Sequence, residues 1–136
     1  MCWQKGIVLA EGKDGDVFLV RRMLDKHVGN YQLFPARDGE EPLQQLERAN
    51  ADAIAPCPDF VVLDLNLPRY SGIQILERSR KIPRCAAAPV IVFTSSDSLQ
   101  DRAEAFRLGA DRFFHKPTDL VGFTKLGERI REILPL

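Results

Sequence analysis

The chain has 136 residues, a length that fits one domain of roughly 100–200 residues. It is 45% hydrophobic and 28% charged, the composition of a soluble globular protein, which excludes a disordered tail or a fibrous repeat. The 19 Lys and Arg residues balance the 19 Asp and Glu residues. No basic excess therefore points to a nucleic acid or to an anionic membrane as a partner.

Location and thiol chemistry follow from what the sequence lacks. No apolar run approaches the roughly 20 residues of a membrane-spanning helix, and the N-terminus has no apolar core of a secretion signal, so we expect a cytoplasmic protein. Cys2, Cys57 and Cys85 are odd in number and form no C-x-x-C pair, so we expect reduced, incidental thiols. Neither His27 nor His115 lies at ligand spacing from a cysteine, which argues against a zinc site.

Short apolar runs alternate with longer amphipathic segments along the chain. The apolar runs predict strands at 6–10, 31–34, 60–64, 89–93 and 112–115. The amphipathic segments predict helices at 16–26, 40–50, 72–81 and 97–108, and a last helix that follows Lys116-Pro117. Asp14 is a candidate cap of the first helix, and Gly109 is a candidate stop for the fourth.

This strict alternation predicts a fold class. Strands that are apolar throughout need helices on both faces, so the sheet should be parallel and the fold a doubly wound, three-layer α/β domain with five strands and five helices. We expect residues 1–136 to form one domain with a core from about 5 to 133. In such a sheet, function lies beyond the carboxyl ends of the strands.

Four polar residues follow four different predicted strands. Glu11 follows the first strand, Asp64 ends the third, Thr94 follows the fourth, and Lys116 follows the fifth. Each alone is usually solvated or, for the threonine, caps the next helix. Two carboxylates, a hydroxyl and an ammonium on one rim of one sheet instead predict a functional site.

This set resembles the receiver domains of two-component response regulators. The similarity spans about Lys5 to Ile133. The motifs that carry it are Asp64-Leu-Asn-Leu-Pro68 with Gly72, Val90-Ile-Val-Phe-Thr-Ser95, Leu108-Gly-Ala110 and Phe113-Phe-His-Lys-Pro117. The loop before the third strand and the segment 65–69 are similar to stand-alone, chemotaxis-type receivers that are often paired with phytochrome-type kinases. The resemblance implies a flavodoxin-like sheet with strand order 2-1-3-4-5.

The resemblance also implies a role for each strand-end residue. Asp64 would be the phosphoacceptor, which attacks the phosphohistidine of a sensor histidine kinase. Thr94 would hydrogen-bond one phosphoryl oxygen, and Lys116 would pair with another as a point charge. Pro117 would follow a cis peptide that turns Lys116 into the site. Phe113 would be the switch aromatic that acts with Thr94, although it lacks the hydroxyl of the usual tyrosine.

A magnesium ion is the implied cofactor, and here the sequence departs from the family. Glu11, Asp64 and the backbone carbonyl of Asn66 would hold the ion, but Gly12 stands where receivers carry a second acid. Because magnesium is bound through one or two carboxylates, this loss predicts a weakened site and slow or failed phosphotransfer. Asp14 and Asp16 could replace the missing acid, but both suit the start of a helix, so Glu11 is the better candidate.

The sequence also bears on two other classes of protein. A nucleotide-binding enzyme is excluded because the glycines at 6, 12 and 15 match neither G-x-G-x-x-G nor a P-loop. A flavin binder lacks its phosphate loop, and a hydrolase lacks G-x-S-x-G. The alternative that stays open is a degenerate receiver that binds a partner without phosphorylation.

The last predicted helix ends at Leu134, so we expect no output domain. We therefore expect the chain to signal by contact with a downstream protein or a phosphotransfer partner. A homodimer through the fourth helix and fifth strand is plausible.

Overall fold

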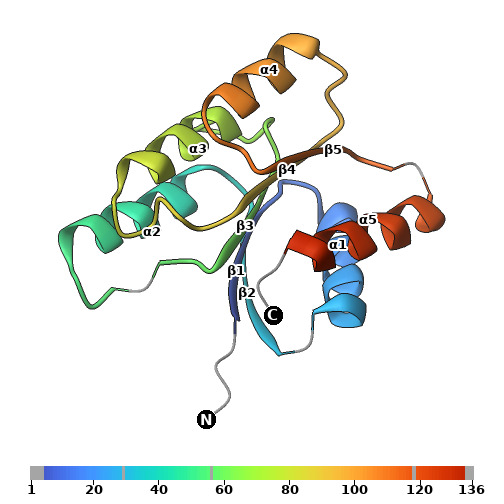
Figure 1. The fold of residues 1–136 in the computed structure, drawn as a ribbon, viewed down its shortest axis with the longest axis horizontal. Helices are drawn as coiled ribbons and strands as arrows, with labels where there is room; N and C mark the ends of the chain where they lie inside the picture. The colour runs from blue at the N-terminus through green and yellow to red at the C-terminus, as the bar shows by residue number, and fades with distance from the viewer. Residues whose placement is uncertain (1–4, 29, 56, 118, 134–136) are drawn as a thin grey trace.

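The computed structural model describes residues 5–28, 30–55, 57–117 and 119–133. Strands and helices alternate along the whole chain (Figure 1). The strands are β1 (Lys5–Ala10), β2 (Tyr31–Ala36), β3 (Phe60–Leu63), β4 (Val90–Thr94) and β5 (Arg112–His115). The helices are α1 (Asp14–His27), α2 (Glu40–Ala51), α3 (Gly72–Lys81), α4 (Leu99–Arg107) and α5 (Leu120–Ile133). No helix among the described residues is long and apolar enough to cross a membrane.

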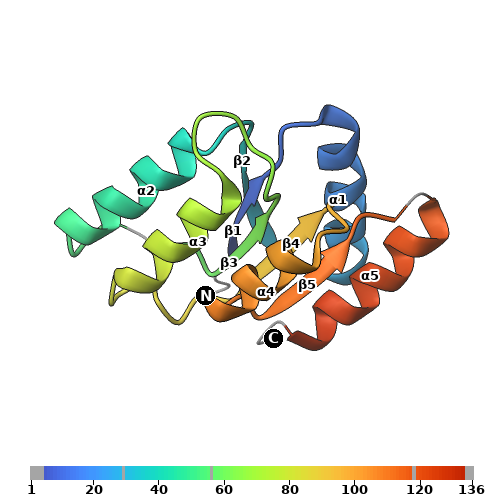
Figure 2. The same cartoon turned by 90° about the horizontal axis from the view of Figure 1, so that it is seen from above.

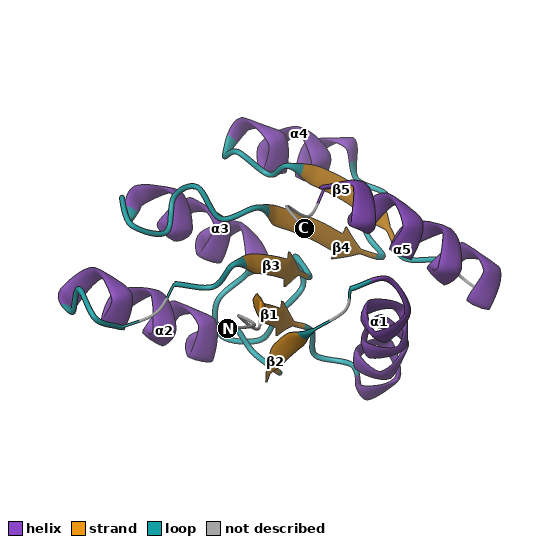
Figure 3. Ribbon diagram, turned by 60° about the horizontal axis from the view of Figure 1, so that its bottom comes forward, coloured by secondary structure: helices purple, strands orange, loops and turns teal. Residues whose placement is uncertain are grey.

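The strands form one parallel sheet in the order β2-β1-β3-β4-β5. Helices α1 and α5 cover one face of this sheet, and α2, α3 and α4 lie on the other (Figures 2 and 3). The predicted doubly wound fold and its strand order are therefore confirmed. The β2 strand is at an edge, which lets it contain Pro35, a residue that cannot donate to a central ladder.

Two apolar cores sit on the two faces of the sheet. Alternate residues of β1 divide between them, with Ile7 and Leu9 in the core under α1 and α5, and Val8 and Ala10 in the core under α2 to α4. Strand side chains point alternately to opposite faces, so a strand that is apolar at every position is buried on both sides. This two-sided burial is why the site has to form at the ends of the strands.

Two helices start at a different residue from the one that the sequence predicted. The first helix already includes Asp14, and Lys13 is the residue that precedes it, without a side-chain cap. Asp14 is therefore not the cap that the sequence predicted. The fourth helix begins at Leu99, later than predicted, because the Ser98 side chain accepts a hydrogen bond from the Asp101 amide at its start. Gly109 follows that helix with φ of +98°, a backbone conformation that favours glycine, as predicted.

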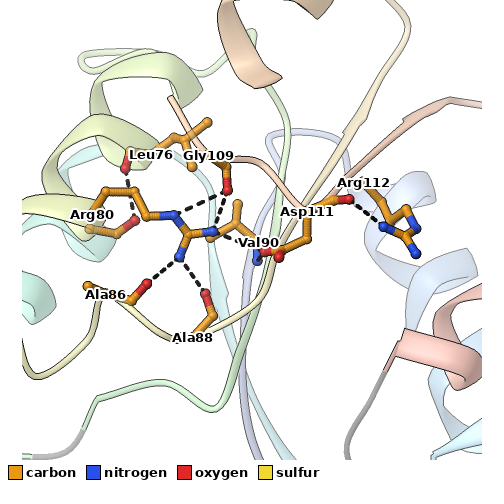
Figure 4. A network of polar contacts seen from close by, with 9 residues as sticks. Leu76, Arg80, Ala86, Ala88, Val90, Gly109, Asp111 and Arg112 are labelled. Carbon is orange, nitrogen blue, oxygen red and sulfur yellow. Dashed lines mark hydrogen bonds and ion pairs between the residues drawn. The ribbon is translucent and has the colours of Figure 1, made fainter. Parts of the chain in front are cut away.

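Arg80 joins the end of α3 to two neighbouring loops (Figure 4). Its guanidinium donates to the carbonyl oxygens of Ala86, Ala88 and Gly109, at distances from 2.6 to 3.2 Å. It also pairs with Asp111 at 3.0 Å, and that carboxylate accepts the amide of Val90. One side chain thus satisfies backbone carbonyls that the loops before β4 and β5 leave unpaired.

The predicted state of the thiols is wrong for two of the three cysteines. Cys57 and Cys85 form a disulfide, with their Cα atoms 5.4 Å apart. Their separation of 28 residues gives no local pattern, because the pair is made by packing the loop before β3 against the turn after α3. Cys2 lies outside the described residues.

Candidate functional site

The strand-end residues meet as predicted, around the ammonium of Lys116. Its Nζ lies 2.7 Å from Glu11 Oε2 and 3.0 Å from Asp64 Oδ2. All three side chains are buried, with Glu11 only 1% exposed. The backbone fixes them in place, because the Asp64 amide donates to Ala10 and the Lys116 amide donates to Thr94.

A third carboxylate joins this group. Asp16 Oδ2 lies 3.0 Å from Lys116 Nζ, so the ammonium contacts Glu11, Asp16 and Asp64 together. Asp16 comes from the first turn of α1, the position where an acid usually serves the helix dipole. Asp14, two residues earlier, is exposed and pairs with Arg37 instead. The sequence offered both acids as candidates and favoured neither, whereas the structure places only Asp16 at the site.

Charge and burial oppose each other at Glu11. Burial raises the pKa of this carboxyl, the neighbouring Asp64 raises it further, and contact with Lys116 offsets only part of the rise. Burial alone would lower the pKa of Lys116, but its contacts with Glu11, Asp16 and Asp64 outweigh that effect and raise the pKa above its ordinary value. The lysine therefore carries its charge at every physiological pH.

The remaining predicted residues lie around this centre. Thr94 is fully buried at the end of β4, and its Oγ1 accepts the Ser96 amide at 3.3 Å. Asn66 is exposed, and its backbone N–H donates to Asp64 Oδ1 at 3.1 Å. The β3–α3 loop that carries Asn66 is held close to α3, because a Cβ on Gly72 would lie 2.3 Å from the Asp64 carbonyl oxygen.

The predicted cis peptide before Pro117 is wrong. No peptide bond between described residues is cis, and Lys116 and Pro117 are both described. The trans form of an X–Pro bond is favoured by about 0.5–1 kcal/mol. With a trans bond the Lys116 ammonium still reaches all three carboxylates, so the contacts within this site do not require the cis isomer.

Phe113 lies away from the carboxylates, half-buried on β5 against α4. Its ring centroid is 6.4 Å from that of Phe106, and the Arg102 guanidinium lies 5.7 Å from both rings. Phe106 and Leu99 are exposed on α4, at 44% and 82%. The stacking of Arg102 was absent from the sequence prediction, since nothing in the local sequence pairs residues on α4 with residues on β5.

The donors at the site suit a hard divalent cation. Carboxylate and carbonyl oxygens are the ligands that magnesium takes in proteins, and three carboxylates here face one ammonium. As they stand, no three acidic, histidine or cysteine side chains among the described residues are arranged to hold a metal ion. The carboxylates are arranged around Lys116 instead, so a cation would have to share their oxygens with the ammonium.

Comparison with known proteins identifies the family. The family model of the response regulator receiver domain matches residues 7–127. The chain belongs to this family. Its members are phosphoacceptor modules of two-component signalling that partner with histidine kinases, rather than catalytic enzymes.

Several relatives extend over nearly the whole receiver. Response regulator Rcp1 of Synechocystis sp. is 28% identical over 93% of this chain and 86% of its own length. A solved structure of the phosphorylated cyanobacterial phytochrome response regulator RcpA superposes with a TM-score of 0.85 at 27% identity, covering 96% of this receiver and 94% of that one. The Mn²⁺-bound form of Rcp1 has a TM-score of 0.82 at 27% identity, with coverages of 94% and 92%.

Longer regulators match over the receiver part only. The transcriptional regulator RpaA of Synechocystis sp. is 33% identical over 64% of this chain, which corresponds to 35% of that protein. The receiver fold is therefore common to proteins with different outputs, and the fold alone does not specify what this chain regulates.

Proposed function

We propose that this receiver accepts a phosphoryl group on Asp64 from a sensor histidine kinase. The observation that carries the proposal is the buried contact between Lys116 Nζ and Asp64 Oδ2, at 3.0 Å, beside Glu11. It places a permanent cation next to a carboxylate at the carboxyl end of β3. Similarity to phosphorylated RcpA supports the same role.

The transfer itself needs positioning and charge neutralisation more than covalent chemistry. An oxygen of Asp64 attacks the phosphorus of a phosphohistidine, the new P–O bond forms, and the P–N bond breaks with its electron pair returning to the imidazole. Lys116 would stay beside the new acyl phosphate as a point charge, and Thr94 would donate its hydroxyl to a phosphoryl oxygen. Magnesium, held by Glu11, Asp64 and the carbonyl of Asn66, would offset the charge repulsion.

The experiment uses a small acyl phosphate as donor, with and without Mg²⁺, and reads intact mass. We expect a mass gain of one phosphoryl group that requires both Mg²⁺ and Asp64, with Asp64→Asn as the control. No gain in the unmodified protein would overturn the proposal. A gain that then appears in Gly12→Asp would indicate a receiver that binds its partner without phosphorylation.

We also propose that the signal leaves by protein contact at the face of α4 and β5, without nucleic acid or membrane. The exposed Leu99 and Phe106 and the partly buried Phe113 support this surface. The partner is a downstream protein or a second copy of the chain. Phosphodonor treatment should change the NMR shifts of Phe106 and Phe113, or the oligomeric state, whereas unchanged spectra and mass in solution would count against this output.

A further inference from the structure

Three carboxylates from three segments of the chain share one ammonium. Oxygens of Glu11, Asp16 and Asp64 all lie within 3.0 Å of Lys116 Nζ. Among the described residues, no second basic side chain pairs with any of these three. When all of them are ionised the group carries a surplus of two negative charges, which is the charge of one divalent cation.

The most buried of the three carboxylates has an oxygen without a hydrogen bond. Glu11 Oε2 is inaccessible to solvent and accepts no hydrogen bond from any described residue, although it lies 2.7 Å from the ammonium. Within the described part of the chain, its charge is balanced only by the ammonium, because burial excludes water from this oxygen. A cation that enters between the acids would share this oxygen with Lys116.

The helical geometry of α1 decides which acid reaches the site. Residues two apart on an α-helix point in nearly opposite directions, since each step turns the helix by about 100°. Val17 and Val20 are buried against the sheet, and this packing directs Asp16 to Lys116 and Asp14 to Arg37. Asp14 is exposed and belongs to another ion pair, so it is a matched control for Asp16.

We propose that Asp16 supplies to a divalent cation the carboxylate that Gly12 lacks, so that Glu11, Asp16 and Asp64 hold the ion. The inference rests on the proposed function, because it concerns the cation that would serve phosphotransfer to Asp64. It differs from the sequence prediction, in which Gly12 weakens the site and Glu11 is the better candidate to replace the missing ligand. The third acid comes from the first turn of α1 instead of the residue after Glu11.

Gly12 leaves room for the usual acid, which permits a rescue experiment. A Cβ at this position would lie 3.5 Å from the Arg37 carbonyl oxygen and 4.0 Å from Pro68 Cδ, both ordinary contact distances. Gly12→Asp should therefore fold, and its carboxylate would start from the position where receivers carry their second acid.

The test measures binding of Mn²⁺ by titration calorimetry, without any phosphodonor. We expect Asp16→Asn and Asp16→Ala each to raise the Kd for Mn²⁺ by about tenfold or more. Asp14→Asn should stay within about twofold, because an exposed ion pair contributes little. Gly12→Asp in the Asp16→Asn background should restore most of the lost affinity.

Measuring the same effect in a Lys116→Met background shows whether Asp16 is a ligand of the cation or only positions Lys116. If Asp16 binds the cation, Asp16→Asn should still weaken Mn²⁺ binding when Lys116 is replaced by Met. An effect that disappears in Lys116→Met, an unchanged Kd in Asp16→Asn, or no Mn²⁺ binding by the unmodified protein would overturn the inference. These outcomes can be told apart from failure of the proposed function, because that function is tested by the mass gain at Asp64 and not by Mn²⁺ binding.

Discussion

The ammonium of Lys116 bridges to the carboxylate of Asp64 across an intervening strand. Lys116 follows β5 and Asp64 follows β3, yet their charged atoms are 3.0 Å apart and both residues are buried. Phe93 of β4 lies between the two strands, and its ring centroid is 5.7 Å from the ammonium. The lysine therefore balances part of the negative charge of the carboxylates that surround it.

Removing that ammonium should destabilise the protein. Lys116→Met leaves three carboxylates without their cation, and breaking a buried pair from one side costs about 3–5 kcal/mol of unfolding free energy. Urea denaturation in a chelating buffer measures the loss. Mg²⁺ should restore part of it, since bound ligand stabilises the folded state. Lys125→Met, on the exposed side of α5, is the control, and an equal loss in both variants would contradict this account.

The disulfide should contribute a measurable share of the stability. Cys57 and Cys85 close a loop with a sequence separation of 28, for which chain entropy predicts about 3–4 kcal/mol. Cys85→Ser should lower the free energy of unfolding, measured by urea denaturation, by that amount, and reduction of the unmodified protein should give the same loss. Cys2→Ser should have little effect. Alkylation of all three thiols in the folded, unreduced protein would show that the bond is absent.

The Arg80 contacts should stabilise both loops at once. Arg80→Met leaves the carbonyl oxygens of Ala86, Ala88 and Gly109 without this donor, and a hydrogen bond to a charged group has a net contribution of about 1.5–3 kcal/mol. We expect a loss of about 2–4 kcal/mol. Lys81→Met, which removes an exposed ion pair with Glu77, should cost less than about 1 kcal/mol. Similar losses in the two variants would argue against the role of Arg80.

Tyr31 should make the protein sensitive to alkali. Burial, together with the hydrogen bond to Asp25, raises the pKa of Tyr31 to about 12. Because the folded state holds this proton more tightly than the unfolded state, stability should fall from about pH 10, where free tyrosine ionises, up to pH 12.

Phenolate absorbance and urea midpoints across that range measure the Tyr31 effect. Tyr31→Phe should remove the titration and flatten the fall in stability. Tyr70→Phe leaves the Tyr31–Asp25 hydrogen bond intact, so the fall in stability should remain in this variant. A fall of the same size in Tyr31→Phe would mean that another group causes it.

Much of the fold could be predicted because each strand and helix has a characteristic spacing of apolar residues in the sequence. Continuous apolar runs such as 60–63 predict strands buried on both faces, and those strands place Asp64, Thr94 and Lys116 on one rim. That step needs only the geometry of a parallel sheet. The helix boundaries shifted by a few residues, as at Ser98, where the cap rather than the apolar pattern sets the start.

By itself the sequence determined the order of elements, the doubly wound sheet and the meeting of Glu11, Asp64 and Lys116. Only the tertiary structure decided that Asp16, and not Asp14, joins them, that Cys57 pairs with Cys85, and that the bond before Pro117 is trans. The reason is physical. The periodic spacing of apolar residues indicates which face of a helix or strand is buried. These contacts depend instead on how a packed helix or loop is rotated and placed against segments that are distant in the sequence.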